Sequence, residues 1–176
     1  MEIGKLKIHK IVVTASVVIL LASPVCAALK PNDIAPTFSL RDMAGKDFYL
    51  SDAVGPKSKE KVRGVIISFF ASWCVPCRKE LPLINSLVDE FKSKGIKVVV
   101  VDVKEDVEVI GELLAELKVD KPMVLSDRYG KTAEKYQIRG LPVTFFIGAD
   151  GKVKHIIFGE ISDSKELREG AGKLLQ

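Results

Sequence analysis

Residues 72–82 read SWCVPCRKELP and hold two cysteines, Cys74 and Cys77, separated by two residues. The stretch follows a nearly continuous apolar run over residues 65–70, which is typical of a strand covered on both faces. A helical pattern follows it, over residues 75–94. The first turn of a helix has unpaired N–H groups and a partial positive charge, and both favour an anion. A thiol placed there becomes a thiolate, the reactive species, more easily.

The position of each residue in this stretch predicts a role. Cys74 lies where the helix begins and is the expected nucleophile, whereas Cys77 lies one turn further in and is the expected resolving thiol. Pro76 fits the first helical turn, where its missing N–H costs nothing. Trp73 either packs or offers an apolar surface to a substrate. A disulfide between such close cysteines closes too small a loop to stabilise the fold much, so the pair indicates chemistry.

Outward from this stretch, apolar periodicity predicts strands alternating with helices. Strands are expected at residues 35–40, 46–50, 65–70, 96–103, 123–125, 143–147 and 153–158. Helices are expected at 75–94, 107–117, 131–136 and from a cap at Ser162 or Asp163 through 175. The first two strands form an N-terminal β-hairpin, and residues 55–63 form a polar loop. The fold class is therefore α/β, a mixed sheet flanked by helices on both faces.

The first 27 residues have the composition of a secretory signal. Three lysines precede an uncharged stretch, and small residues follow at 26–28, so cleavage is expected after Ala27 or Ala28. The alternative is an uncleaved anchor, because residues 11–29 carry no charge and are just long enough to span a bilayer. Both alternatives place residues 28–176, the expected single domain, outside the cytoplasm, in the periplasm or an equivalent compartment.

Charge and ligand counts argue against two other functions. The formal net charge is +4, but part of it lies in the leader, and no face-long run of basic residues follows it. Nucleic-acid binding is therefore not expected. One Cys-x-x-Cys pair supplies two metal ligands where zinc takes four. His155 is the only histidine outside the leader and is read as an ordinary strand residue, so no metal is expected.

The chain as a whole resembles the thioredoxin superfamily, and more narrowly its exported TlpA/ResA-like thiol–disulfide oxidoreductases. The likeness extends from residue 35 to the last helix. Residues 73–77 (WCVPC) are similar to the family's W-C-x-P-C, and Pro82 to the proline that bends its active-site helix. Residues 140–145 (GLPVTF) resemble the loop whose proline is cis in the family and lies beside the disulfide. Residues 105–125 resemble a central helix–strand insertion.

The resemblance implies further site residues. Leu141 and Pro142 would face the substrate. Without the resemblance, Pro142 is interpreted as a trans proline that begins a strand, because cis X-Pro bonds are uncommon. Plain thioredoxins have a buried aspartate where Ser68 stands, so proton transfer by that route is in doubt. Glu80 lies on the helical face of Cys77, one turn along, and ResA-like proteins have a glutamate there. It is read either as the acceptor of the Cys77 proton or as an exposed residue paired with a lysine.

The family also implies partners. A reductase of this kind needs no organic cofactor, acts on disulfide-containing client proteins and is re-reduced by a membrane donor of the DsbD/CcdA type. Between the cysteines, Val75 and Pro76 offer no side-chain donor to the Cys74 sulfur, which favours a reductant over an oxidant. Apocytochromes c awaiting haem are candidate clients, although no residue identifies them.

Two alternative functions use related sequences. Peroxiredoxin-like thiol peroxidases share the hairpin pattern, but their P-x-x-x-T-x-x-C motif needs proline and threonine where Ile67 and Ala71 stand. Copper-carrying accessory proteins on the same fold use C-x-x-x-C with a distant histidine, and the two-residue spacing here differs from that.

Overall fold

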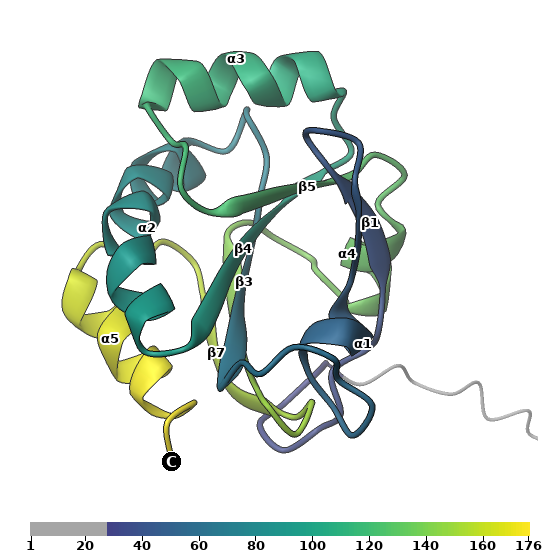
Figure 1. The fold of residues 1–176 in the computed structure, drawn as a ribbon. Coiled ribbons are helices and arrows are strands. Elements are labelled where there is room, and N and C mark those ends of the chain that lie inside the picture. Colours follow the sequence, from purple (N-terminus) through teal and green to yellow (C-terminus); the bar gives the residue numbers. More distant parts are fainter. Residues whose placement is uncertain (1–27) are drawn as a thin grey trace, which may run out of the picture.

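The computed structural model describes residues 28–176, which form a seven-stranded mixed sheet with helices on both faces (Figure 1). The strand order is β2-β1-β5-β4-β3-β6-β7. Three central strands are parallel: β3 (Gly64–Phe70), β4 (Ile96–Val103) and β5 (Met123–Asp127). The antiparallel strands are β1 (Ser39–Asp42), β2 (Asp47–Tyr49), β6 (Val143–Gly148) and β7 (Val153–Phe158). The expected N-terminal hairpin and mixed sheet are confirmed.

Residues 28–176 form five helices, of which the first four lie between strands and the last follows β7: α1 (Leu50–Ala53), α2 (Val75–Ser93), α3 (Val107–Leu117), α4 (Lys131–Lys135) and α5 (Ser164–Gly172). In Figure 1, α2 and α5 lie on one side of the sheet and α1 and α4 on the other. The expected insertion is present as α3 and β5, and β5 joins the sheet between β4 and β1. Among residues 28–176, no helix is both long and apolar enough to cross a membrane. The expected leader lies outside these residues.

Strand β3 separates two apolar clusters because successive side chains of a strand point to opposite faces. Ile66 and Phe70 pack under α2 with Phe91 and other residues of that helix. Val65, Ile67 and Phe69 belong to the other cluster, where the Tyr136 ring meets Phe145 edge-on at 5.0 Å. All seven residues of β3 are buried, as expected of a strand covered on both faces.

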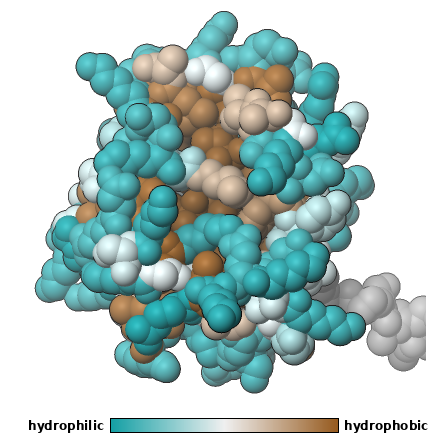
Figure 2. All heavy atoms as spheres, in the orientation of Figure 1, coloured by the Kyte–Doolittle hydropathy of each residue, from teal (hydrophilic) through white to brown (hydrophobic). Residues whose placement is uncertain are grey.

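Polar and charged residues cover most of the face shown in Figure 2, although apolar side chains reach the surface between α3 and β5. Elsewhere, large apolar side chains are exposed near the start of α2, where Trp73 and Val75 are 70% and 63% exposed.

Helix α5 packs so closely on the sheet that one of its glycines is required. A Cβ at Gly170 would lie 2.4 Å from the buried Phe146 ring, whereas one at Gly172 would meet nothing within 4 Å. We expect Gly170→Ala to lower the free energy of unfolding by about 2 kcal/mol through overpacking. The matched Gly172→Ala should be neutral or slightly stabilising. Urea denaturation measures both, and equal stabilities would show that α5 is not held against Phe146.

Candidate active site

The two cysteines form a disulfide at the start of α2, with an S–S distance of 2.05 Å and Cα atoms 5.2 Å apart. Cys74 is the N-cap residue of the helix, and its sulfur accepts a hydrogen bond from the Cys77 N–H at 3.3 Å. An acceptor at this place meets the unpaired N–H groups of the first turn. A thiolate on Cys74 would have the same partner together with the favourable end of the helix dipole.

Cys77 is more buried than Cys74, as expected, but the difference is small, because the two residues are 1% and 4% exposed. Pro76 lies in the first helical turn as expected, and Pro82 lies inside the helix. Trp73, next to the disulfide, is largely exposed. The indole is therefore available to a partner protein instead of serving the core.

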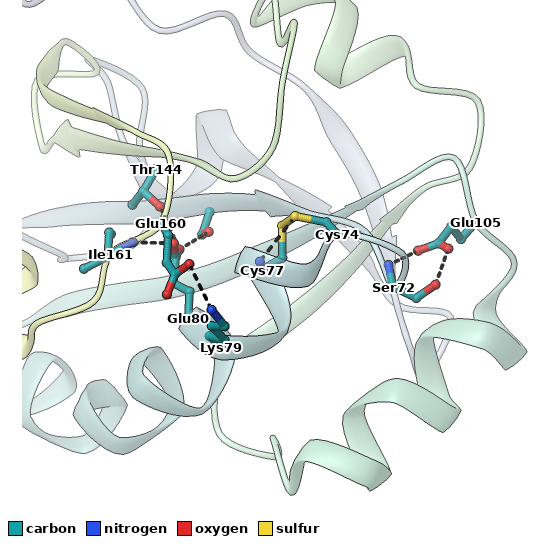
Figure 3. The surroundings of a disulfide bond; sticks show 10 residues. Ser72, Cys74, Cys77, Lys79, Glu80, Glu105, Thr144, Glu160 and Ile161 are labelled. Atoms are coloured by element: carbon teal, nitrogen blue, oxygen red, sulfur yellow. Dashed lines mark hydrogen bonds and ion pairs between the residues drawn. A yellow bond between two sulfur atoms is a disulfide. The ribbon is translucent and has the colours of Figure 1, made fainter.

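Glu80 is only 1% exposed and points into the protein from the buried face of α2. One carboxylate oxygen accepts hydrogen bonds from Ser68 Oγ (3.0 Å) and Thr144 Oγ1 (3.3 Å). The other accepts one from the Ile161 N–H at 3.1 Å (Figure 3). The alternative of an exposed glutamate paired with a lysine is therefore wrong. The neighbouring lysine, Lys79, is 3.9 Å from Glu160 instead.

The surroundings of Glu80 change its acidity. Burial raises the pKa of its carboxyl above the ordinary value, and the three hydrogen bonds offset this only in part. Ser68 occupies the place where plain thioredoxins have an aspartate, and here its hydroxyl donates to Glu80. A buried carboxyl with a raised pKa, three residues after Cys77 on one helical face, is well placed to exchange a proton with that thiol.

The Leu141–Pro142 peptide is cis, in agreement with the resemblance and not with the trans alternative. Leu141 packs against the apolar cluster that contains both cysteines.

Two open grooves, of about 540 and 600 Å³, meet at the cis-proline loop and share residues 138–141. Trp73 and Tyr129 line one groove, and Phe158 lines the other. Tyr129 and Phe158, which are both highly exposed, did not stand out in the sequence.

A carboxylate other than Glu80 contacts the active-site turn, and the sequence does not predict this contact. Glu105, in the loop between β4 and α3, accepts hydrogen bonds from the Ser72 N–H and the Ser72 hydroxyl. Its backbone N–H donates to Asp102, which is fully buried at the end of β4. Figure 3 shows Glu80 and Glu105 on opposite sides of the disulfide.

The other positions considered in the sequence supply no reactive side chain to this site. His155, in β7, lies 3.2 Å from the Lys173 ammonium. Ile67 and Ala71 are fully buried apolar residues at the positions where a peroxidase motif needs proline and threonine. Within residues 28–176, no group of three or more His, Cys, Asp and Glu side chains is arranged to hold a metal ion.

Such a fold, with a Cys-x-x-Cys pair at the start of a helix and a cis-proline loop, defines a thioredoxin-like thiol–disulfide oxidoreductase. Comparison with known proteins agrees. The model of the AhpC/TSA family matches residues 31–156. The thiol-disulfide oxidoreductase ResA of Bacillus subtilis is 35% identical over 130 residues, which cover 74% of this chain and 68% of that protein. The chain belongs to the AhpC/TSA family and is homologous to the ResA thiol-disulfide oxidoreductases.

Solved structures agree on the fold. A putative thiol:disulfide interchange protein DsbE from Chlorobium tepidum superimposes with a TM-score of 0.73 at 31% identity, over 85% of this chain and 100% of that one. The peroxidoxin BcpB from Mycobacterium tuberculosis has a TM-score of 0.68 at 24% identity, over 84% of this chain and 97% of that one. At that identity the second likeness shows the fold alone.

Proposed function

We propose that this protein is an exported reductase of protein disulfides, with Cys74 as the nucleophile and Cys77 as the resolving thiol. The observation that carries the proposal is the place of the Cys74 sulfur, at the N-cap of α2 with the Cys77 N–H directed at it. A negative charge at this sulfur is stabilised in the reduced protein, so Cys74 is the thiol that ionises first.

The reaction consists of two exchanges. The Cys74 thiolate attacks one sulfur of a client disulfide, which forms a mixed disulfide and releases the other client sulfur as a thiolate. Cys77 then loses its proton to Glu80 and attacks the Cys74 sulfur. This second exchange closes the Cys74–Cys77 disulfide and expels the second client thiolate, so the client gains two electrons. Two thiols of an external donor return the enzyme to its reduced form.

The client would lie across the grooves on either side of the cis-proline loop. Leu141 and Pro142 would present backbone groups to an extended client segment, as an added strand does. Trp73 and Pro76 would contact the same segment from the α2 side. The large exposure of Trp73 supports this role, because an exposed aromatic ring beside a reactive group is typical of a binding surface.

The reducing direction and the partners rest on the sequence and on family membership. Neither the Val75 nor the Pro76 side chain can donate a hydrogen bond to the Cys74 sulfur, so the thiolate gains less stabilisation than in a strong oxidant. Apocytochromes c are the proposed clients and a membrane protein of the DsbD/CcdA type the proposed donor. The leader at residues 1–27, or an anchor at 11–29, would place the domain in the periplasm or an equivalent compartment.

A Cys77→Ser variant tests the proposal, because it can form the mixed disulfide but cannot release the client. Expressed in its native envelope, it should accumulate adducts that dithiothreitol releases and that are about 10-fold more abundant than in the wild type. Mass spectrometry of the released proteins names the clients. The Cys74→Ser/Cys77→Ser double variant is the control and should trap nothing. Adducts equally abundant in the double variant, or absent from a folded Cys77→Ser protein, would contradict the proposal.

A further inference from the structure

The turn before Cys74 is held from outside by a single carboxylate. Ser72 N–H donates to Glu105 Oε2 at 2.6 Å, and Ser72 Oγ donates to Glu105 Oε1 at 2.5 Å. Both carboxylate oxygens of Glu105 therefore accept hydrogen bonds from Ser72, which lies two positions before the nucleophile. Glu105 reaches this turn because β3 and β4 are parallel and paired through Phe70 and Asp102. The segments that follow the two strands consequently meet at one edge of the sheet (Figure 3).

Asp102 contacts Glu105 from the protein interior, through a hydrogen bond to the Glu105 backbone. The Asp102 side chain is fully buried, and its Oδ1 accepts the Glu105 N–H at 3.1 Å, whereas its Oδ2 has no hydrogen-bond partner. A buried carboxylate oxygen without a donor is costly. The cost disappears if Asp102 carries a proton, because the carboxyl then donates to the carboxylate of Glu105.

The acidities of the two groups fit one shared proton. Burial, then the hydrogen bond to Glu105 and the charge of Glu105, raise the pKa of Asp102 to about 8. Burial opposes ionisation of Glu105 as well, but the hydrogen bonds from Asp102 and Ser72 outweigh it and lower the pKa of Glu105. The pair therefore holds a protonated Asp102 beside an ionised Glu105 over a wide range of pH.

We propose that Asp102 and Glu105 are positioning residues of the active site, which hold the turn at Ser72, and with it Trp73 and Cys74, through one shared proton. The proposal deepens the thiol–disulfide function proposed above and rests on it. Loss of the proton leaves two adjacent carboxylates that repel each other. The Glu105 side chain then moves away from Asp102, and its hydrogen bonds to Ser72 weaken. The turn that contains Ser72, Trp73 and Cys74 consequently becomes more mobile.

Of the other charges near the pair, that of Asp127 strengthens this effect. Asp127, at the end of β5, adds a third negative charge that acts on Asp102. Lys104 is exposed, and its side chain lies across Gly130, where a Cβ would come within 2.3 Å of the lysine Cε. Asp106 pairs with Arg128 at 2.8 Å. The active-site turn contacts the pair through Ser72, which donates its hydrogen bonds to Glu105. None of these side chains donates a hydrogen bond to Asp102 Oδ2.

The fluorescence of Trp73, the only tryptophan of the chain, tests the proposal in the oxidised enzyme, where no thiol titrates. Wild-type emission should change with a midpoint near pH 8. Asp102→Asn should abolish this transition, because the amide donates to Glu105 at every pH. Glu105→Gln should also abolish it, with emission like that of the alkaline wild type throughout. Glu108→Gln, an exposed acid in the first turn of α3, is the control and should titrate as the wild type does.

Reductase kinetics give a second measurement. If only the protonated pair positions the turn, kcat/KM of the wild type relative to Asp102→Asn should fall about 10-fold between pH 7 and pH 9. An unchanged Trp73 titration in Asp102→Asn, or no transition in the wild type, would overturn the proposal while leaving the reductase function intact. Absence of reductase activity in every variant and in the wild type would instead contradict the function and leave the fluorescence result standing.

Discussion

Replacement of Cys74 by serine is expected to lower the rate of protein-disulfide reduction by about 10³-fold or more, to the uncatalysed level. Serine lacks an ionisable thiol, so no mixed disulfide can form. The fold should survive, because serine is a favoured N-cap residue and the lost disulfide closes a loop too short to contribute much stability. Reduction of insulin disulfides at pH 7, with dithiothreitol as electron donor, measures the loss.

Cys77→Ser is the matched control for this experiment. Both variants lose the same disulfide, so any difference between them reports which sulfur attacks first. Cys77→Ser should still react with one equivalent of a small aromatic disulfide and release one thiolate in a single burst, whereas Cys74→Ser should release none. If Cys74→Ser shows the burst and Cys77→Ser does not, the two roles are reversed and Cys77 is the nucleophile.

The central part of the fold could be predicted from the sequence because its patterns are strong and local. Strand β4 has the expected bounds, Ile96–Val103, because a continuous apolar run buried on both faces has few alternatives. Helix α2 differs from the expectation only at its C-terminus, since apolar residues repeat along one face and Gly95, with φ 74°, ends it. The cap of α5 is Asp163, one of the two expected residues.

The errors lie where tertiary contacts decide the local structure. Strand β1 was expected at residues 35–40 and forms at Ser39–Asp42. The sequence predicts a strand that includes Leu50, but Leu50 begins α1, and its N–H donates to the Phe38 carbonyl. Helix α5 was expected to reach residue 175 and ends at Gly172, because Gly170 and Gly172 lower its helical propensity. Short amphipathic segments carry too little periodicity to fix such bounds.

From the residues themselves, the active site was predictable only around the Cys-x-x-Cys stretch, whereas the distant cis-proline loop at Leu141–Pro142 was indicated by the family resemblance. The motif alone does not determine whether Glu80 is buried, although Glu80 lies on the same face of α2 as the buried residues Cys77 and Ile84. Asp102 and Glu105 were missed, because Glu105 lies 33 residues from Ser72. Their contact follows from the parallel pairing of β3 and β4, which would place the ends of both strands at one edge once the sheet order was assumed.

Glu80→Gln is expected to slow release of the client about 100-fold, the usual contribution of a general base, with little effect on the first attack by Cys74. Glutamine fits the site, because the amide can accept from Ile161 N–H while the hydroxyls of Ser68 and Thr144 rotate to accept from its NH₂ group. Rapid-quench measurements of a mixed disulfide formed on Cys74 separate the two steps. The variant should accumulate this intermediate, whereas the wild type should not.

The pH dependence distinguishes a base from a merely structural residue. Burial raises the pKa of Glu80, so the wild-type release rate should rise with pH through that raised value, and Glu80→Gln should lose this part of the profile. Glu116→Gln, which removes an exposed acid that pairs with Arg78 near the start of α2, should keep the wild-type profile. An unaltered release rate and profile in Glu80→Gln would eliminate Glu80 as the proton acceptor.

Stability should change in the opposite direction from activity. A carboxyl whose pKa is raised in the folded state stabilises the fold fully below its unfolded pKa, and this contribution is lost as pH rises through the folded pKa. Ionisation of Glu80 in the folded protein therefore costs stability above its unfolded pKa, and a neutral glutamine avoids this cost. We expect Glu80→Gln to have a higher Tm than the wild type at pH 7, and the difference to disappear near pH 4. A variant that is slower in release yet more stable would show that the buried charge is retained for proton transfer at the expense of stability, whereas a lower Tm at pH 7 would show that the carboxylate contributes to the fold itself.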